Sequence, residues 1–218
     1  MISNKKTNFK RGLNNMETTN IKLKKLMQTA LLAALCYVSF TFLQIKIPIP
    51  GGDATSLHIG NAFCVLAALL LGGFYGGLAG AVGMTIADIF DPVYITVAPK
   101  TFVLKLCIGL ITGFVAHRIA KISESNDKKY ILKWSIISSV CGLAFNVVAD
   151  PIVGFFYKQY VLGQPQEFAK VLAKLSAVTT FANAVVSVIL VAFLYNALRP
   201  LLSKANLLLP IYPKSAAK

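Results

Sequence analysis

The sequence predicts an all-α integral membrane protein with six transmembrane helices and both termini in the cytoplasm. Hydrophobic residues make up 56% of the 218 residues, charged residues only 14%, and the mean hydropathy is +0.67. A soluble domain carries roughly 25% charged residues. Apolar runs recur from Leu26 to Leu198, and the basic residues between them gather in a few segments. The chain is therefore expected in a bilayer.

Six stretches approach the length of about 20 mostly apolar residues that a transmembrane helix needs. They are residues 26–45, 57–72, 74–90, 99–119, 131–156 and 171–198. The second and third are short and are separated by GGFYGG, which predicts either a tilted helical hairpin with a tight turn or a partly re-entrant pair. The expected organisation is a disordered basic tail at 1–20, one six-helix membrane domain at 21–204 and a C-terminal tail at 205–218.

The distribution of basic residues predicts the orientation. If the N-terminus lies inside, 16 of the 22 Lys and Arg residues fall in the inner segments, which are the head, the loop after the fourth span and the tail. The positive-inside rule then places both termini in the cytoplasm. The net charge of +14 does not form a basic patch interleaved with aromatic residues, so a nucleic-acid partner is not expected.

Signals for catalysis and metal binding are absent from the sequence. The four cysteines lie in apolar runs without C-x-x-C spacing, and no phosphate-binding G-x-x-x-x-G-K-[ST] or zinc-binding H-E-x-x-H occurs. No catalytic residue, cofactor or metal is therefore predicted, and any ATP hydrolysis is expected from partners. Two alternatives stay open: a membrane enzyme using Asp88, Asp91 and Asp150 as acids or metal ligands, and a self-sufficient carrier.

Several polar residues fall in the outer halves of the predicted helices or in the outer loops. Such groups cost a few kcal/mol each at membrane depth unless they are paired or hydrated, so their clustering predicts an outward-facing pocket. The predicted substrate-binding residues are His58, Asn61, Asp88, Tyr94, Lys105, Asn146, Asp150 and Asn183. Amides, charges and aromatic rings together suit a small, polar, ring-shaped solute.

Two lysines of the fourth predicted span have different expected roles. Lys105 lies inside the span, where an unpaired ammonium is expensive, so it needs a partner. Asp88, Asp150 or an acidic or hydroxyl group of a ligand can serve, and an internal ion pair is as reasonable as a ligand. Lys100 follows Pro99 at the start of the span and is expected to snorkel to the outer interface.

The first outer connection reads IKIPIPGGDATSLHIGN, residues 45–61. Pro48 and Pro50 favour an extended chain, and Gly51 and Gly52 permit a sharp turn. This segment is either a lid over the pocket or an ordinary connecting loop.

Small residues recur at four-residue spacing on two of the predicted helices. Ala30 and Ala34 form a flat stripe on the first span, suited to close approach by a helix of this chain or of a partner. Gly72, Gly76 and Gly80 form a second series, for which close helix packing is the favoured interpretation.

The run HIGNAFCVLAALLLGGFYGGLAGAVGMTIADIFDPVYITVAPKTFVLKLCIGLITGFVAH resembles the substrate-binding S components of energy-coupling factor (ECF) vitamin transporters. The elements GNA, AD and Y-x-x-x-AP-x-TF-x-x-K are similar to the riboflavin-type branch, which includes carriers of hydroxymethylpyrimidine and pyridoxine. The match covers residues 26–119 well. The chain departs from it at ADIFDP and LKLCIG, where glycines often follow the acid and the lysine, so the pocket is expected to have its own shape.

This resemblance implies a six-helix protein in a bacterial plasma membrane that captures a vitamin from outside. The loaded protein then docks on a membrane scaffold driven by two cytoplasmic ATPases. Ala30 and Ala34 would meet the scaffold, and residues 45–57 would form the gate. A pyridoxine or hydroxymethylpyrimidine type of ring is the favoured substrate, with riboflavin next.

Overall fold

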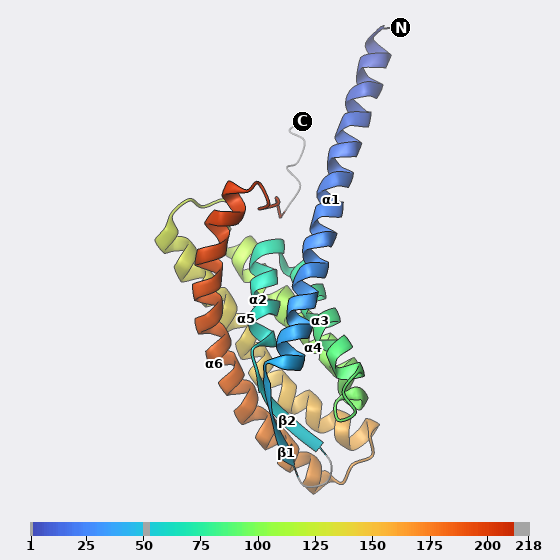
Figure 1. Cartoon of the computed structure of the whole chain (residues 1–218), viewed down its shortest axis with the longest axis vertical. Helices are drawn as coiled ribbons and strands as arrows, with labels where there is room; N and C mark the ends of the chain where they lie inside the picture. The colour runs from blue at the N-terminus through green and yellow to red at the C-terminus, as the bar shows by residue number, and fades with distance from the viewer. Residues whose placement is uncertain (1, 50–52, 212–218) are drawn as a thin grey trace.

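The computed structural model describes residues 2–49 and 53–211, with side chains from residue 19 onward. Its helices form an elongated bundle with a β-hairpin at the end away from the start of α1 (Figure 1). The elements are α1 (Ile2–Phe42), β1 (Gln44–Ile49), β2 (Asp53–His58), α2 (Gly60–Leu71), α3 (Gly73–Ile89), η1 (Ile95–Val97), α4 (Ala98–Phe114), η2 (Val115–Ile119), α5 (Lys128–Phe156), η3 (Tyr157–Val161) and α6 (Gln166–Lys204).

Four helical segments are long and apolar enough to cross a membrane: Thr19–Phe42, Ile95–Ile119, Lys128–Val161 and Gln166–Lys204. This agrees with the predicted all-α membrane class. The second and third predicted spans correspond to α2 and α3, which have 12 and 17 residues. At 1.5 Å per residue α2 covers only about 18 Å of a hydrocarbon core of about 30 Å. Six crossings and the inside location of the termini remain predictions.

Helix α2 lies at the core of the bundle. Eleven of its 12 residues are buried, and it contacts α1, α3, α4, α5 and α6. The surrounding helices therefore cover it along its length. Gly72, at φ +88°, joins it to α3, a backbone conformation that glycine adopts without strain. The tight turn of this helical hairpin is therefore Gly72 alone, and the rest of the GGFYGG segment forms the start of α3.

The glycine series brings helix backbones into direct contact. A Cβ atom at Gly76 would lie 2.2 Å from the backbone of Ala68 in α2, and one at Gly109 would lie 2.1 Å from the Cα of Gly77. No side chain larger than hydrogen fits at those distances. The predicted close packing is confirmed for α2 against α3 and for α3 against α4.

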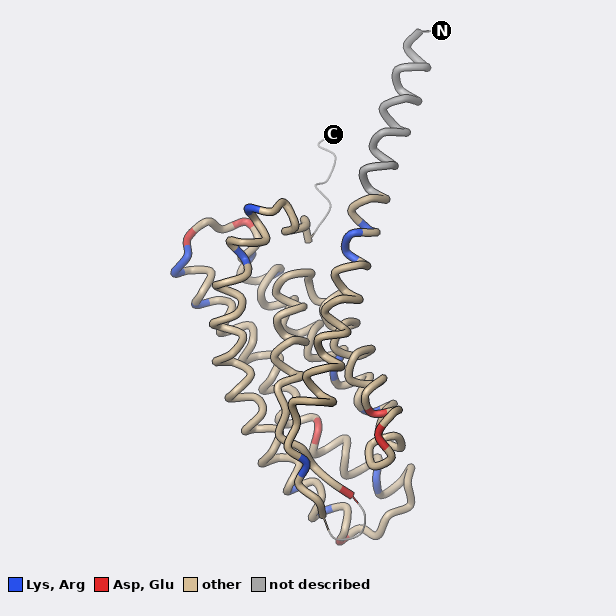
Figure 2. The backbone as a smooth tube through the Cα atoms, viewed as in Figure 1, with Lys and Arg blue, Asp and Glu red and all other residues tan. Residues whose placement is uncertain are grey.

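Helix α1 has a packed face and an open face. A Cβ at Gly83 of α3 would lie 2.2 Å from the carbonyl oxygen of Ala33, so this face of α1 is in close contact with α3. Ala30 and Ala34 lie on the exposed side of α1. The helix begins at Ile2, within the segment predicted as a disordered tail, and the predicted division of the chain stays a prediction. Charged residues gather mostly toward the two ends of the bundle (Figure 2).

The segment between α1 and α2 is an antiparallel hairpin, with β1 and β2 in register from Gln44 opposite His58 to Ile49 opposite Asp53. The sequence predicts an extended connection here, and the two strands are a finding of the structure. The alternation of isoleucine with other residues in QIKIPI is typical of a strand, since β-branched residues favour the pleated backbone. Pro48 pairs with Ala54, whereas Pro50, Gly51 and Gly52 lie outside the described residues.

Candidate functional site

A cavity of about 120 Å³ lies beneath the hairpin, toward the end of the bundle where β1 and β2 are found. A buried water needs about 10 to 15 Å³ of cavity volume measured in this way. The cavity therefore has room for roughly ten waters or for one small ring with short substituents. All eight residues predicted to bind substrate line this cavity: His58, Asn61, Asp88, Tyr94, Lys105, Asn146, Asp150 and Asn183. Their role as substrate ligands stays a prediction.

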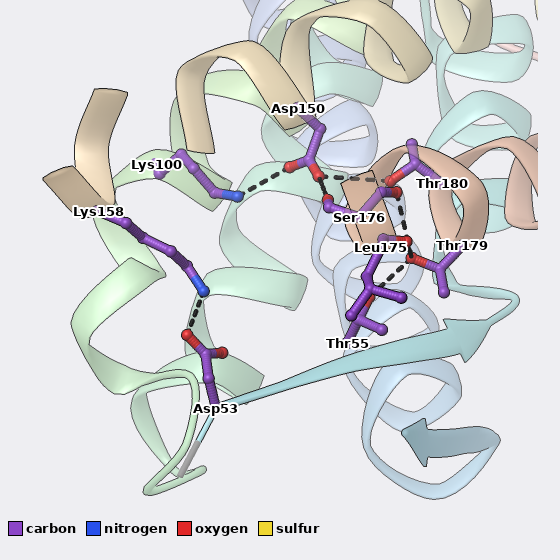
Figure 3. Close-up of polar contacts among 9 residues, drawn as sticks. All are labelled: Asp53, Thr55, Lys100, Asp150, Lys158, Leu175, Ser176, Thr179 and Thr180. Atoms are coloured by element: carbon purple, nitrogen blue, oxygen red, sulfur yellow. Dashed lines mark hydrogen bonds and ion pairs between the residues drawn. The ribbon is translucent and has the colours of Figure 1, made fainter. Parts of the chain in front are cut away.

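Asp150 is the most heavily engaged acid of the cavity. It accepts from Lys100 Nζ at 2.9 Å and from Thr180 Oγ1 at 3.3 Å, and Ser176 Oγ also donates to it (Figure 3). The expectation that Lys100 snorkels to the outer interface is wrong. Its side chain is only 11% exposed, because the carboxylate of Asp150 holds it in the cavity wall. This pair was not predicted, because Lys100 and Asp150 lie 50 residues apart and no local sequence pattern links them.

Lys158 of η3 forms a second ion pair with Asp53 at the start of β2 (Figure 3). Both residues line the cavity and both side chains are largely buried. Lys158 is not among the residues predicted from the sequence to bind substrate. Its position near the end of a predicted span is typical of an interfacial lysine, so only the fold identifies its partner.

Lys105 takes no internal partner. In the part of the chain that the structure describes, no carboxylate lies within 4.0 Å of its ammonium, and its Nζ donates no hydrogen bond. The predicted internal ion pair with Asp88 or Asp150 is therefore not formed. Lys105 is nevertheless only 7% exposed.

Four further buried residues of the cavity have an oxygen without a hydrogen-bond partner among the described residues. These oxygens are Oδ1 of Asn61, Oδ2 of Asp88, the hydroxyl of Tyr94 and Oδ1 of Asn146. The four residues are at most 7% exposed. A buried polar atom left unpaired costs about 1 to 3 kcal/mol, so this set is suited to a ligand that supplies the missing donors.

An aromatic corner completes the cavity wall. The rings of Phe40 and His58 lie 4.7 Å apart in an edge-to-face arrangement, and the rings of Phe40 and Tyr94 lie 6.1 Å apart. Burial, together with the charge of Lys105, lowers the pKa of His58 to about 3. Burial raises the pKa of Tyr94 to about 12. Both side chains are therefore uncharged near neutral pH.

Helix α6 holds the hairpin over the cavity. Asn183 accepts a hydrogen bond from the backbone N–H of His58 and donates one to the carbonyl of Ser56, both at 3.0 Å. One turn earlier, the hydroxyl oxygens of Thr179 and Thr55 lie 2.7 Å apart (Figure 3). The sequence carried a signal for this contact, since Ser176, Thr179, Thr180 and Asn183 lie on one helical face.

The geometry does not support a site made of three aspartates. Asp91 pairs with Lys46 of β1 and is not among the residues that line the cavity. Asp88 and Asp150 do line it. Oδ2 of Asp88 has no hydrogen-bond partner among the described residues, whereas Asp150 accepts from Lys100, Ser176 and Thr180.

Comparison with known proteins adds the family. The model of the family "ECF-type riboflavin transporter, S component" matches residues 20–200. The chain is also 36% identical over 77 residues to a Pyrococcus woesei protein described as "Uncharacterized protein in gap 3'region". That match covers 35% of this chain and 50% of the relative, so the chain spans about half the length of the relative it matches. No solved structure matches the chain.

The family match covers most of the chain and includes every residue that lines the cavity. In general, members bind a small vitamin and work with a membrane scaffold and ATPase subunits. The chain therefore belongs to the ECF-type riboflavin transporter S component family, and it is a multi-pass membrane protein.

Proposed function

We propose that this S component captures a small water-soluble vitamin or precursor from outside a bacterial cell and holds it in the cavity beneath the hairpin. A pyridoxine or hydroxymethylpyrimidine type of ring is favoured, and riboflavin is the next candidate. The observation that carries the proposal is the set of buried, unpartnered polar groups that converge on one cavity from α2, α3, α4 and α5. The cavity volume of about 120 Å³ favours a single ring.

The hairpin acts as the gate. It covers the cavity with β2, and several contacts attach it to other elements: Asn183 with the backbone at Ser56 and His58, Thr179 with Thr55, and the ion pairs Lys158–Asp53 and Lys46–Asp91. A solute is expected to enter and leave the cavity when these contacts open. Pro48 belongs to this gate, and the proposed roles of Pro50, Gly51 and Gly52 concern residues outside the described part.

The exposed face of α1 supports the proposed docking on the scaffold subunit. Ala30 and Ala34 lie there with Met27 and Leu31, both large apolar side chains that are well exposed. Small residues let a partner helix approach closely in a bilayer. The loaded protein docks through this face, and two cytoplasmic ATPases supply the energy for release inside.

The orientation of the proposal places the hairpin outside and both termini in the cytoplasm of the plasma membrane. Basic residues in the early part of α1 and at the end of α6, such as Lys22, Lys24, Arg199 and Lys204, support it. At the hairpin end, three lysines form ion pairs with aspartates, so much of the positive charge there is neutralised.

Reconstitution into vesicles tests the division of labour. The purified protein alone is expected to bind a labelled vitamin without accumulating it, and accumulation is expected only with the scaffold, both ATPases and ATP. Accumulation by the protein alone would favour the self-sufficient carrier. Chemical conversion of the vitamin by the purified protein would contradict the transporter role.

A further inference from the structure

The charged residues that line the cavity are balanced but not all paired. Three lysines and three aspartates line it: Lys100, Lys105, Lys158, Asp53, Asp88 and Asp150. Four of the six form the two ion pairs Lys100–Asp150 and Lys158–Asp53. One ammonium and one carboxylate are therefore left for a solute.

The remaining two are Lys105 of α4 and Asp88 of α3. They are 7% and 2% exposed, and no ion pair within 4.0 Å joins them. Oδ2 of Asp88 accepts no hydrogen bond, and Nζ of Lys105 donates none, among the residues that the structure describes. A buried charge is strongly unfavourable unless it is paired and hydrogen-bonded. The cavity is therefore suited to an occupant that supplies the complementary groups.

The charge balance restricts the occupant. A solute carrying only a positive group would satisfy Asp88 and leave Lys105 unpaired, and a solute carrying only a negative group would do the reverse. A phosphate ester would bring about two negative charges to a lining in which Lys105 is the one lysine without an aspartate partner. The lining thus favours a solute with no net charge that bears both kinds of group.

We propose that the solute is an amphoteric heteroaromatic ring of zero net charge, of the hydroxypyridine class. Its protonated ring nitrogen donates to Asp88, and the oxygen of its acidic hydroxyl accepts from Lys105. Further hydroxyl substituents donate to the unpaired Oδ1 atoms of Asn61 and Asn146. The inference rests on the proposed function, since it names the substrate class of the same cavity. It places pyridoxine ahead of both hydroxymethylpyrimidine and riboflavin.

Calorimetric titration of the full chain in detergent tests the inference with pyridoxine as the probe. Two analogues each remove one group, the acidic hydroxyl in the 3-O-methyl ether and the ring nitrogen in the benzene analogue, and a third, the 5′-phosphate, adds negative charge. Each is expected to bind about 10- to 100-fold more weakly than pyridoxine, because each leaves a buried charge unpaired or adds an unpaired one. Riboflavin and hydroxymethylpyrimidine are titrated alongside.

Two variants assign the contacts. Asp88→Asn is expected to weaken pyridoxine by about 10- to 100-fold but to change the affinity of the benzene analogue less than about three-fold. Lys105→Met is likewise expected to weaken pyridoxine by about 10- to 100-fold but to change the affinity of the 3-O-methyl ether less than about three-fold. Glu167→Gln is the control, because Glu167 is an exposed acid at the start of α6 that pairs with Lys170 and does not line the cavity, and this variant should bind pyridoxine with wild-type affinity.

The analogue series uses the wild-type protein, so it decides the question even if a variant fails to fold. Equal binding of pyridoxine and its analogues, or tighter binding of riboflavin or hydroxymethylpyrimidine, would overturn the amphoteric assignment and leave vitamin capture intact. If none of these vitamins binds, and a wider panel of vitamins gives no binding either, the proposed function itself fails.

Discussion

Asn183 is the residue whose removal should open the gate. Its carboxamide bonds to the carbonyl of Ser56 and the N–H of His58, so it pairs with β2 as a neighbouring strand would. In Asn183→Ala both bonds are lost and two backbone groups lose their partners. One hydrogen bond contributes about 0.5 to 1.5 kcal/mol net, and a group left unpaired costs about 1 to 3 kcal/mol.

Water can reach the freed backbone groups when the hairpin lifts, so the closed gate is expected to lose about 2 to 3 kcal/mol. At 1.4 kcal/mol per factor of ten, this corresponds to release of a bound vitamin about 30 to 150 times faster. The assay is stopped-flow displacement of a labelled vitamin by excess unlabelled vitamin from the purified protein.

Asn196→Ala is the matched control. Asn196 is also on α6, but its side chain bonds to the carbonyl of Ala192 in its own helix, away from the hairpin. The Asn196→Ala protein should release the labelled vitamin at the wild-type rate. If Asn183→Ala binds vitamin and releases it within about two-fold of the wild-type rate, the hairpin is not held by this contact and the reasoning is refuted.

Three further predictions concern docking, packing and pH. Ala34→Trp should leave vitamin affinity unchanged and abolish uptake in vesicles with the partner subunits, because the indole prevents close approach at the exposed face of α1. Gly109→Ala should lower thermal stability by about 1 to 3 kcal/mol or more, since its Cβ would lie 2.1 Å from the Cα of Gly77. His58→Gln should flatten the acid dependence of stability: the wild-type pKa of about 3 lies below the ordinary value of 6.5, so the neutral imidazole stabilises the fold fully above pH 6.5. That contribution, about 1 to 2 kcal/mol between pH 8 and pH 5, is lost as the pH falls.

The docking and packing predictions each have a control variant on another helix of the bundle. Ala197→Trp, at an exposed position of α6, should allow normal uptake if the Ala34 effect is specific to docking. Gly154→Ala should be tolerated, because the nearest atom to its Cβ would be Lys100 Nζ at 3.4 Å. For pH, wild type and His58→Gln are compared by apparent melting temperature from pH 8 to pH 5, and parallel curves would contradict the assignment.

The cavity residues could be found from the sequence because polar groups in apolar helices are costly and therefore informative. Asn61 and Asn146 each place an amide side chain within a long apolar run, and both residues line the cavity. The helix contacts at Gly76 and Gly109 were predictable for the same reason, since small residues at regular spacing have few other uses in a bilayer.

The pairing of charges could not be predicted in the same way. Asp150 was expected to be available to Lys105, but the fold places Lys100 against it, and the choice depends on the relative rotation of α4 and α5. The hairpin was missed because Pro48 and the neighbouring glycines indicate a loop, while β1 and β2 pair over only six residues each. The contribution of Lys158 depends on the position of β2, which no local pattern specifies.

Mass spectrometry of small molecules released on denaturation tests the central claim most directly. The full chain is expressed in rich medium, purified in detergent and denatured, and the released compounds are quantified against the protein. The account predicts one vitamin at about one molecule per chain in the wild type and much less in Asn183→Ala, whose gate releases it during purification. No released vitamin from the wild type, together with no vitamin that raises its melting temperature, would contradict the account.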